Sequence, residues 1–157
     1  MQRRHLVLAA ASLPALAPTA WAHHGWSSFD QERPVWLEGK VVTSRWRNPH
    51  AELVIEVPAS LRVPADLAQR PVPAQTAPVD GSALLAKAVV PTRRDRRWEL
   101  ELAPLTRMEA WKVAEIKPGA DVSALGFIFK DEKGEAIMRV EYLYVDGKAY
   151  GLRSSPA

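Results

Sequence analysis

Histidine is the residue type whose placement in this sequence points most directly to chemistry. The chain has four histidines, and three of them, His23, His24 and His50, lie in one short stretch after which no further histidine occurs. Neutral imidazole is the commonest protein ligand for transition metals. Because these three rings are gathered near one end of the chain, the sequence predicts a metal site rather than scattered surface histidines.

The residues before His23 have the three parts of a secretory signal peptide. Arg3 and Arg4 form a basic start, residues 6–16 form a short apolar run, and Ala20-Trp21-Ala22 is a small-residue cleavage motif. The apolar run is shorter than the roughly 20 residues that a membrane-spanning helix needs. We therefore expect residues 1–22 to be removed on export to the periplasm, with no membrane span in the mature chain.

A mature chain that begins with histidine offers two nitrogen donors from one residue. The α-amino group and ring of His23 can close a chelate ring, because a divalent ion displaces the proton of an α-amine more readily than that of a lysine. An imidazole from elsewhere would complete a histidine brace, whose nitrogen-only set favours copper, with nickel and zinc as alternatives. We expect His50 to be that ligand, since Pro49 restricts its backbone. His24 is a competing ligand through its ring and preceding amide.

Two tryptophans lie close to these histidines in the sequence. Trp26 and Trp46 are expected to shield the site and to pack against a cationic centre. The alternative interpretation is structural: a histidine pair at an exported terminus is simply solvated, and His50 only satisfies a backbone carbonyl.

Alternating apolar and polar residues predict a mainly β fold. The expected strands cover 34–46, 51–57, 98–102, 121–130, 136–145 and 148–152, and one short helix covers 105–112. Gly39 interrupts the first strand and predicts a bulge or sharp coil there. This order favours one domain over residues 23–157, a small OB-like barrel of five to six strands.

The segment 58–95 differs from the rest because it is rich in proline and alanine. Proline cannot donate to a β ladder, so we expect a long loop insertion, mobile in part, with at most one helical turn over 83–88. We interpret it as a tolerated insertion rather than a lid. The tail 153–157 is expected to fray.

Several functional classes are not supported by the residues present. The chain has no cysteine, and its net charge of +3 falls when Arg3 and Arg4 leave, so neither a thiolate site nor a nucleic-acid partner is expected. The sequence contains no nucleophile elbow and no phosphate-binding glycine loop, so no such motif indicates an enzyme. The alternative function is a metal-free binding module for a periplasmic protein or envelope ligand. Its stacking platform would be aromatic, namely Trp36, Phe127, Phe129, Tyr142 and Tyr144.

Several motifs together resemble those of a known family. They are Ala22-His23-His24-Gly25-Trp26, the Gly-containing strand 34–41, Trp46-Arg47-Asn48-Pro49-His50-Ala51, and the later segments 98–102 and 117–122. In these the chain resembles DUF6152, a family of unknown function whose members are exported. The resemblance implies a small barrel and the histidine set, and it implies no reaction. Residues 58–95 depart from the pattern, where a short turn is usual.

Overall fold

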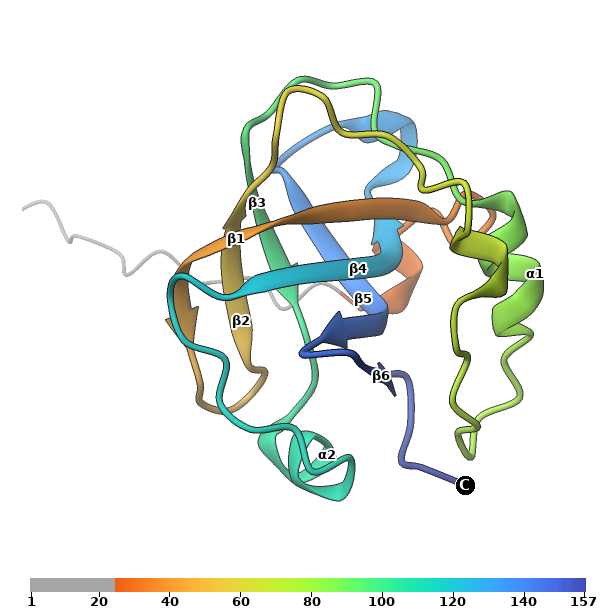
Figure 1. The fold of residues 1–157 in the computed structure, drawn as a ribbon, viewed down its shortest axis with the longest axis vertical. Helices are drawn as coiled ribbons and strands as arrows, with labels where there is room; N and C mark the ends of the chain where they lie inside the picture. Colours follow the sequence, from red (N-terminus) through yellow and green to blue (C-terminus); the bar gives the residue numbers. More distant parts are fainter. Residues whose placement is uncertain (1–24) are drawn as a thin grey trace, which may run out of the picture.

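The computed structural model describes residues 25–157, which form six strands and two short α-helices (Figure 1). The strands are β1 (Val35–Arg45), β2 (Glu52–Glu56), β3 (Arg97–Glu101), β4 (Asp121–Ile128), β5 (Ile137–Val145) and β6 (Lys148–Gly151). The helices are α1 (Gly81–Lys87) and α2 (Leu105–Ala110). None of the helices formed by residues 25–157 has the length and apolar character needed to cross a bilayer.

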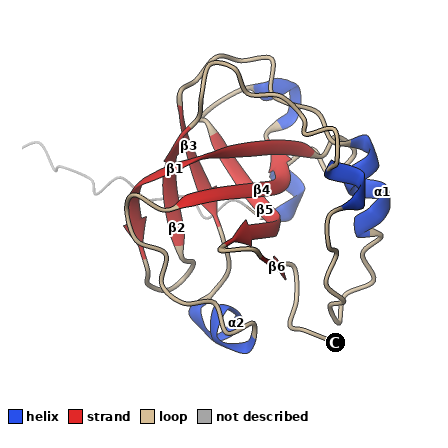
Figure 2. Cartoon of the chain, viewed as in Figure 1, coloured by secondary structure: helices blue, strands red, loops and turns tan. Residues whose placement is uncertain are grey.

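Strands β1 to β5 close into a barrel. Antiparallel pairing runs in the order β3-β2-β1-β4-β5, and a parallel pairing of β3 with β5 closes the circle. Strand β6 continues from β5 as an extra antiparallel strand. Figure 2 shows the strands gathered in one body, with α2 at one end and α1 at its side. The prediction of a small mainly β barrel of OB-like order is confirmed. Among residues 25–157, α2 lies within the helix expected over 105–112, and α1 covers most of the helical turn expected over 83–88.

The first strand needs glycine at the place where it passes closest to its neighbour. A β-carbon on Gly39 would lie 2.3 Å from the backbone oxygen of Glu56, much closer than any real contact. The pairing of β1 with β2 then shifts register between Val41 and Thr43. A bulge of this kind bends the strand and increases its twist, which a small closed barrel requires. The predicted irregularity therefore lies just beyond Gly39.

The interior of the barrel is apolar because alternate residues of each strand point inward. Leu53 and Ile55 of β2, Leu100 of β3 and Val140 of β5 are all completely buried in this cluster. Alternation along a strand sends the neighbouring side chains to the outer face. The outer face of β2, β3 and β5 therefore carries the charged residues described below.

The insertion 58–95 is an ordered cover on the outside of the barrel, which corrects the expectation of a partly mobile loop. Its two anchors are Leu67 and Leu85, each 2% exposed, which join Trp36 and Tyr142 of the barrel in a second apolar cluster. Helix α1 begins where the carboxylate of Asp80 accepts a hydrogen bond from the Ala83 backbone N–H at 3.0 Å. The prolines exclude β pairing in this segment, but Leu67 and Leu85 still pack on the apolar surface of Trp36 and Tyr142.

The C-terminal tail is also fixed, so the prediction that it frays is wrong. The Ser154 backbone N–H donates to the Gln75 side chain at 3.1 Å, and the Trp111 indole donates to the Ser154 carbonyl at 2.8 Å. Gln75 and Pro156 form an antiparallel bridge. The tail is held because the insertion passes beside it, and this long-range neighbour has no local sign in the sequence.

Candidate functional site

The loop between β1 and β2 places His50 at the entrance of β2. The Asn48 carboxamide oxygen accepts a hydrogen bond from the Leu105 backbone N–H at 3.1 Å, which ties the loop to the start of α2. The Asn48–Pro49 peptide bond is cis. The Ala51 backbone N–H donates to the Ala103 carbonyl at 2.9 Å, continuing the β2–β3 ladder. Hydrogen bonds at Asn48 and Ala51 thus hold the chain on both sides of His50, and the His50 side chain is half-buried.

A buried ion pair lies beside the His50 ring. Glu101 of β3 and Arg139 of β5 are opposite each other in the parallel register, and their Oε2 and Nε atoms are 3.0 Å apart. Both side chains are 8% exposed. Burial lowers the pKa of Arg139 from its ordinary value, Glu101 opposes this shift, and the nearby Arg107 adds to it. An arginine stays protonated under such conditions, so the pair is ionic.

Arg139 also contacts His50 directly. Its Nη1 atom is 3.4 Å from the Nε2 atom of the imidazole. Guanidinium groups donate hydrogen bonds and cannot accept them. In this contact the Nε2 atom of His50 must therefore be the acceptor, and it uses the same lone pair that a metal ion would take.

The first described residues of the chain pack against this same arginine. The ring of Trp26 lies 5.3 Å from the Arg139 guanidinium carbon and 4.1 Å from that of Arg153. Phe29 is buried and forms a bridge to Phe129, and the Asp30 backbone N–H donates to the Ile128 carbonyl at 2.8 Å. The segment that directly follows His24 is therefore fastened to the barrel on the side of His50.

A second buried carboxylate joins several parts of the chain. Glu141 of β5 is fully buried and accepts from Arg153 Nε at 2.7 Å and from Gln75 Nε2 at 3.0 Å. Arg153 also donates to the Gln31 side chain at 3.1 Å. One carboxylate thus connects the N-terminal segment, the insertion and the C-terminal tail, which explains why all three are ordered around it.

The outer face of β2 and β3 beside the ion pair is acidic. Glu99 is half-buried there, and burial raises its pKa, with a further upward contribution from the neighbouring Glu52. Arg45 pairs with Glu52 and acts in the opposite direction. The part of this shift that comes from Glu52 reflects the negative charge of this face.

The predicted ligands are only partly covered by the structure. His23 and His24 lie outside the described residues, as does the predicted signal peptide, so their positions relative to His50 remain a prediction. Within residues 25–157 no group of three histidine, aspartate or glutamate side chains is arranged to hold a metal ion. Trp26 does pack on cationic groups as expected, but these are arginines, and Trp46 packs partly buried against the barrel core.

Sequence reasoning did not single out Glu101, Arg139, Glu141 and Arg153. In β5 the charged residues alternate with apolar ones, and this pattern is typical of a solvent-facing side. The burial of Glu101, Arg139 and Glu141 depends on the N-terminal segment and the insertion lying over that side. The alternation of residues along one strand does not reveal that distant segments of the chain will lie over it.

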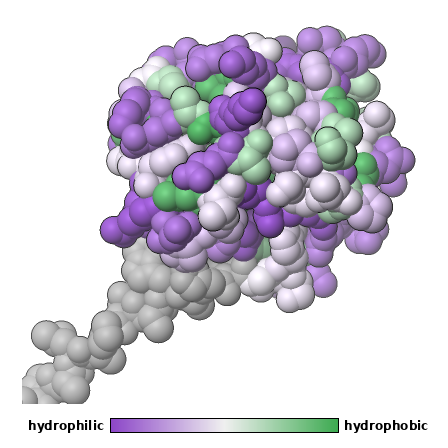
Figure 3. Space-filling view, turned by 90° about the horizontal axis from the view of Figure 1, so that it is seen from below, coloured by the Kyte–Doolittle hydropathy of each residue, from purple (hydrophilic) through white to green (hydrophobic). Residues whose placement is uncertain are grey.

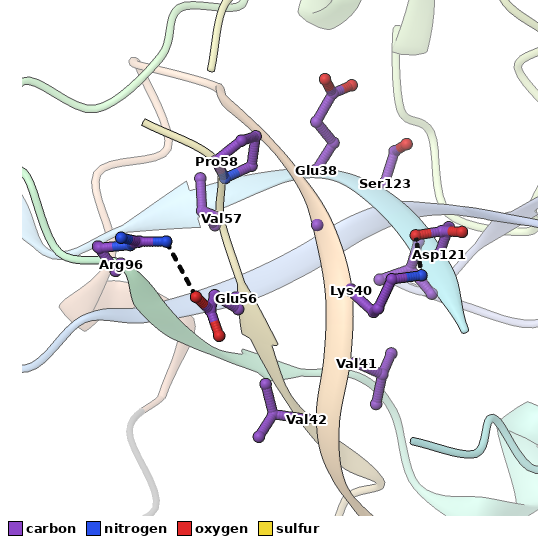
Figure 4. A pocket seen from close by; sticks show the side chains of 12 residues that line it. Glu38, Lys40, Val41, Val42, Glu56, Val57, Pro58, Arg96, Asp121 and Ser123 are labelled. Atoms are coloured by element: carbon purple, nitrogen blue, oxygen red, sulfur yellow. Dashed lines mark hydrogen bonds and ion pairs between the residues drawn. The ribbon is translucent and has the colours of Figure 1, made fainter. Parts of the chain in front are cut away.

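An open groove lies at the far end of β2 from His50. It has a volume of about 630 Å³, and its lining comes from β1, β2, β4 and the loop before β3 (Figure 4). Its rim carries two ion pairs, Lys40 with Asp121 at 2.8 Å and Arg96 with Glu56 at 3.0 Å. Four of its five charged side chains pair with each other, and the fifth, Glu38, accepts a hydrogen bond from the Trp36 indole, so the groove carries an excess of one negative charge.

The described surface offers little apolar area. Among residues 25–157, Val89 is the one large hydrophobic side chain classed as exposed, at 37%. On the face drawn in Figure 3, green hydrophobic residues are scattered between purple and white ones. Of the aromatic residues considered as a stacking platform, Trp36, Phe127 and Tyr142 are 0%, 1% and 1% exposed, and Phe129 and Tyr144 are half-buried.

Residues 10–62 of the chain match the model of a family of unknown function, DUF6152. The match covers about a third of the chain and includes the three histidines and the loop that leads into β2. It confirms the family resemblance over these residues, whereas Glu101, Arg139 and Arg153 lie beyond them. No curated protein and no solved structure matches the chain.

Proposed function

We propose that the chain is exported to the periplasm, processed after Ala22, and binds a single metal ion, copper, through its new N-terminus. The α-amine and ring of His23 and the ring of His50 would form a histidine brace, with His24 assisting. Its role would be carriage or sensing of the ion rather than catalysis. The observation that carries this proposal is the packing of Trp26 on Arg139, the residue that touches His50.

The distances along the chain support this proposal. His23 lies two positions before Gly25, the first described residue, and an extended chain covers at most about 7 Å over two positions. Trp26 and His50 are both in contact with the guanidinium group of Arg139. These lengths are compatible with a His23 terminus that reaches the His50 ring.

The charges around His50 also favour a cation. Glu101 is buried beside it, and Glu52 and Glu99 lie on the adjoining outer face of β2 and β3. Carboxylates near a metal site stabilise the bound ion and orient its ligands. Arg139 acts against a cation here, because its guanidinium group contacts the His50 ring directly.

The test is a copper(II) competition titration of protein with an authentic His23 terminus. A variant with one additional alanine before His23 loses the chelate ring, and His50→Ala loses the distant imidazole. We expect each change to weaken copper binding by at least tenfold, or about 1.4 kcal/mol. Arg47→Ala, in the same exposed loop, is the matched control and should leave the affinity unchanged. Equal affinity with and without the additional alanine would show that there is no brace.

A second candidate function rests on the groove between β1, β2 and β4. We propose as the alternative that the chain is a metal-free module that holds a periplasmic protein or envelope ligand in this groove, since it is open and charged side chains lie on its rim. This alternative expects Lys40→Ala and Arg96→Ala to weaken capture of the ligand, and His50→Ala to leave it intact. Loss of capture in His50→Ala would count against the groove.

A further inference from the structure

We infer that Arg139 is an affinity-determining residue of the proposed metal site: it occupies the His50 ring in the metal-free protein and must leave it before a metal ion can bind. This inference rests on the proposed function and adds the residue that sets its strength. The carrying observation is the 3.4 Å contact between Arg139 Nη1 and His50 Nε2.

The contact is incompatible with metal binding through either ring nitrogen. If the metal takes Nε2, it uses the lone pair that now accepts from Arg139. If the metal takes Nδ1, the neutral ring carries its proton on Nε2, and Nε2 can no longer accept a hydrogen bond. Metal-bound histidines normally donate from the second nitrogen to a carboxylate, a carbonyl or water. Arginine offers none of these acceptors, so the contact has to break in both cases.

Breaking the contact does not require Arg139 to leave its pocket. A different nitrogen, Nε, pairs with Glu101 at 3.0 Å, and the guanidinium also lies over the rings of Trp26 and Phe29 at 5.3 and 5.8 Å. These partners can hold the arginine while its Nη1 end turns away from His50. The cation would still lie close to the bound ion and repel it. Arg139 therefore weakens metal binding in two ways, by occupying the ligand and by its charge.

The test measures copper(II) affinity in variants of the processed full chain. In Arg139→Gln the cation is gone, and we expect the affinity to rise roughly tenfold, the value of one charge-assisted hydrogen bond. Damage to the fold does not produce a gain in affinity, so the direction of the change separates the two effects. Arg107→Gln is the matched control, because Arg107 lies near enough to affect Arg139 electrostatically but donates to the Leu152 carbonyl. Its effect should be less than about twofold.

A second variant covers the case in which Arg139→Gln does not fold because Glu101 is left buried and unpaired. Arg139→Gln combined with Glu101→Gln removes both charges, and we expect a smaller rise in affinity, roughly threefold. Affinity that stays equal or falls in the folded variant overturns the inference. If His50→Ala weakens binding while the Arg139 variants bind as the parent does, the proposed site stands and the inference fails. If His50→Ala changes nothing, the proposed function itself fails.

Discussion

The outside of this barrel is covered in two places, and the two covers have opposite chemistry. On the insertion side, Leu67 and Leu85 lie on Trp36 and Tyr142, and the contact is mainly apolar, although Arg70 also lies over the Trp36 ring. On the His50 side, the N-terminal segment lies on paired charges, Glu101 with Arg139 and Glu141 with Arg153. Apolar burial stabilises a fold without specifying a ligand, whereas buried charge is costly unless it is paired. The comparison fits a stabilising role for the insertion and the binding role proposed for the His50 side.

The largest effect that separates the two sides is expected from Leu85→Ala. This removes a 2% exposed anchor of the insertion and should lower the free energy of unfolding by about 3 kcal/mol. Copper affinity at 25 °C should not change, because the cluster does not include the His50 side. Urea unfolding of the variant beside Ala86→Gly, an exposed position of the same helix, measures the packing effect separately from helix propensity. A loss of copper affinity in a Leu85→Ala variant that is fully folded would show that the two sides are coupled.

Gly81→Ala probes the same contact by adding volume instead of removing it. A β-carbon at this position would lie 2.0 Å from Val72 Cγ1 and 2.5 Å from Tyr142 Oη. Overpacking of this kind should destabilise the protein by about 2 kcal/mol, measured by thermal or urea unfolding. If the insertion is loosely attached, α1 can shift and the cost will be close to zero, which would contradict the assignment of a stabilising cover.

A third substitution tests Glu132, which ties the end of the insertion to the β4–β5 loop. Burial raises its pKa, but hydrogen bonds from Thr92 and Arg93 and the ion pair with Arg33 outweigh burial, and the pKa of Glu132 is lowered overall. A lowered folded-state pKa means stability that is present above the unfolded-state pKa and is lost as the pH falls through the folded-state value. We expect Glu132→Gln to cost about 1 kcal/mol at pH 7. Its cost should shrink below about pH 4, as urea midpoints at several pH values would show.

On the His50 side, the glutamate-to-glutamine substitution at Glu99 should raise the stability of the fold instead of lowering it. Burial raises the pKa of Glu99, and Glu52 adds to the shift. A carboxyl whose folded-state pKa is raised destabilises the fold at neutral pH, and this penalty disappears as the pH falls below that value. Glu99→Gln should therefore stabilise the protein slightly at pH 7, by about 0.5 kcal/mol. The gain should be absent at pH 3. A destabilised variant at pH 7 would mean that the acidic face is structural.

The sequence was informative where structure follows local pattern and uninformative where distant segments cover each other. Alternation along β2 and β3 and the glycine at position 39 led to the barrel, because pleat and twist are local properties. The insertion and the tail were misjudged, since Leu85 and Ser154 are held by partners far away in the chain. For the site, His50 was identified by its residue type. Arg139 was not, because a charged residue in an alternating strand is ordinarily on the solvent side.

The contact between Trp26 and Arg153 has a consequence for the order of events during synthesis. Trp26 belongs to the beginning of the domain and Arg153 to its last five residues, yet their side chains are 4.1 Å apart at the guanidinium carbon and the ring centre. A ribosome makes Trp26 long before its partner exists. The packing of Trp26 on Arg153 can form only once residue 153 has been made, so a product that ends before it would hold the start of the domain without this contact.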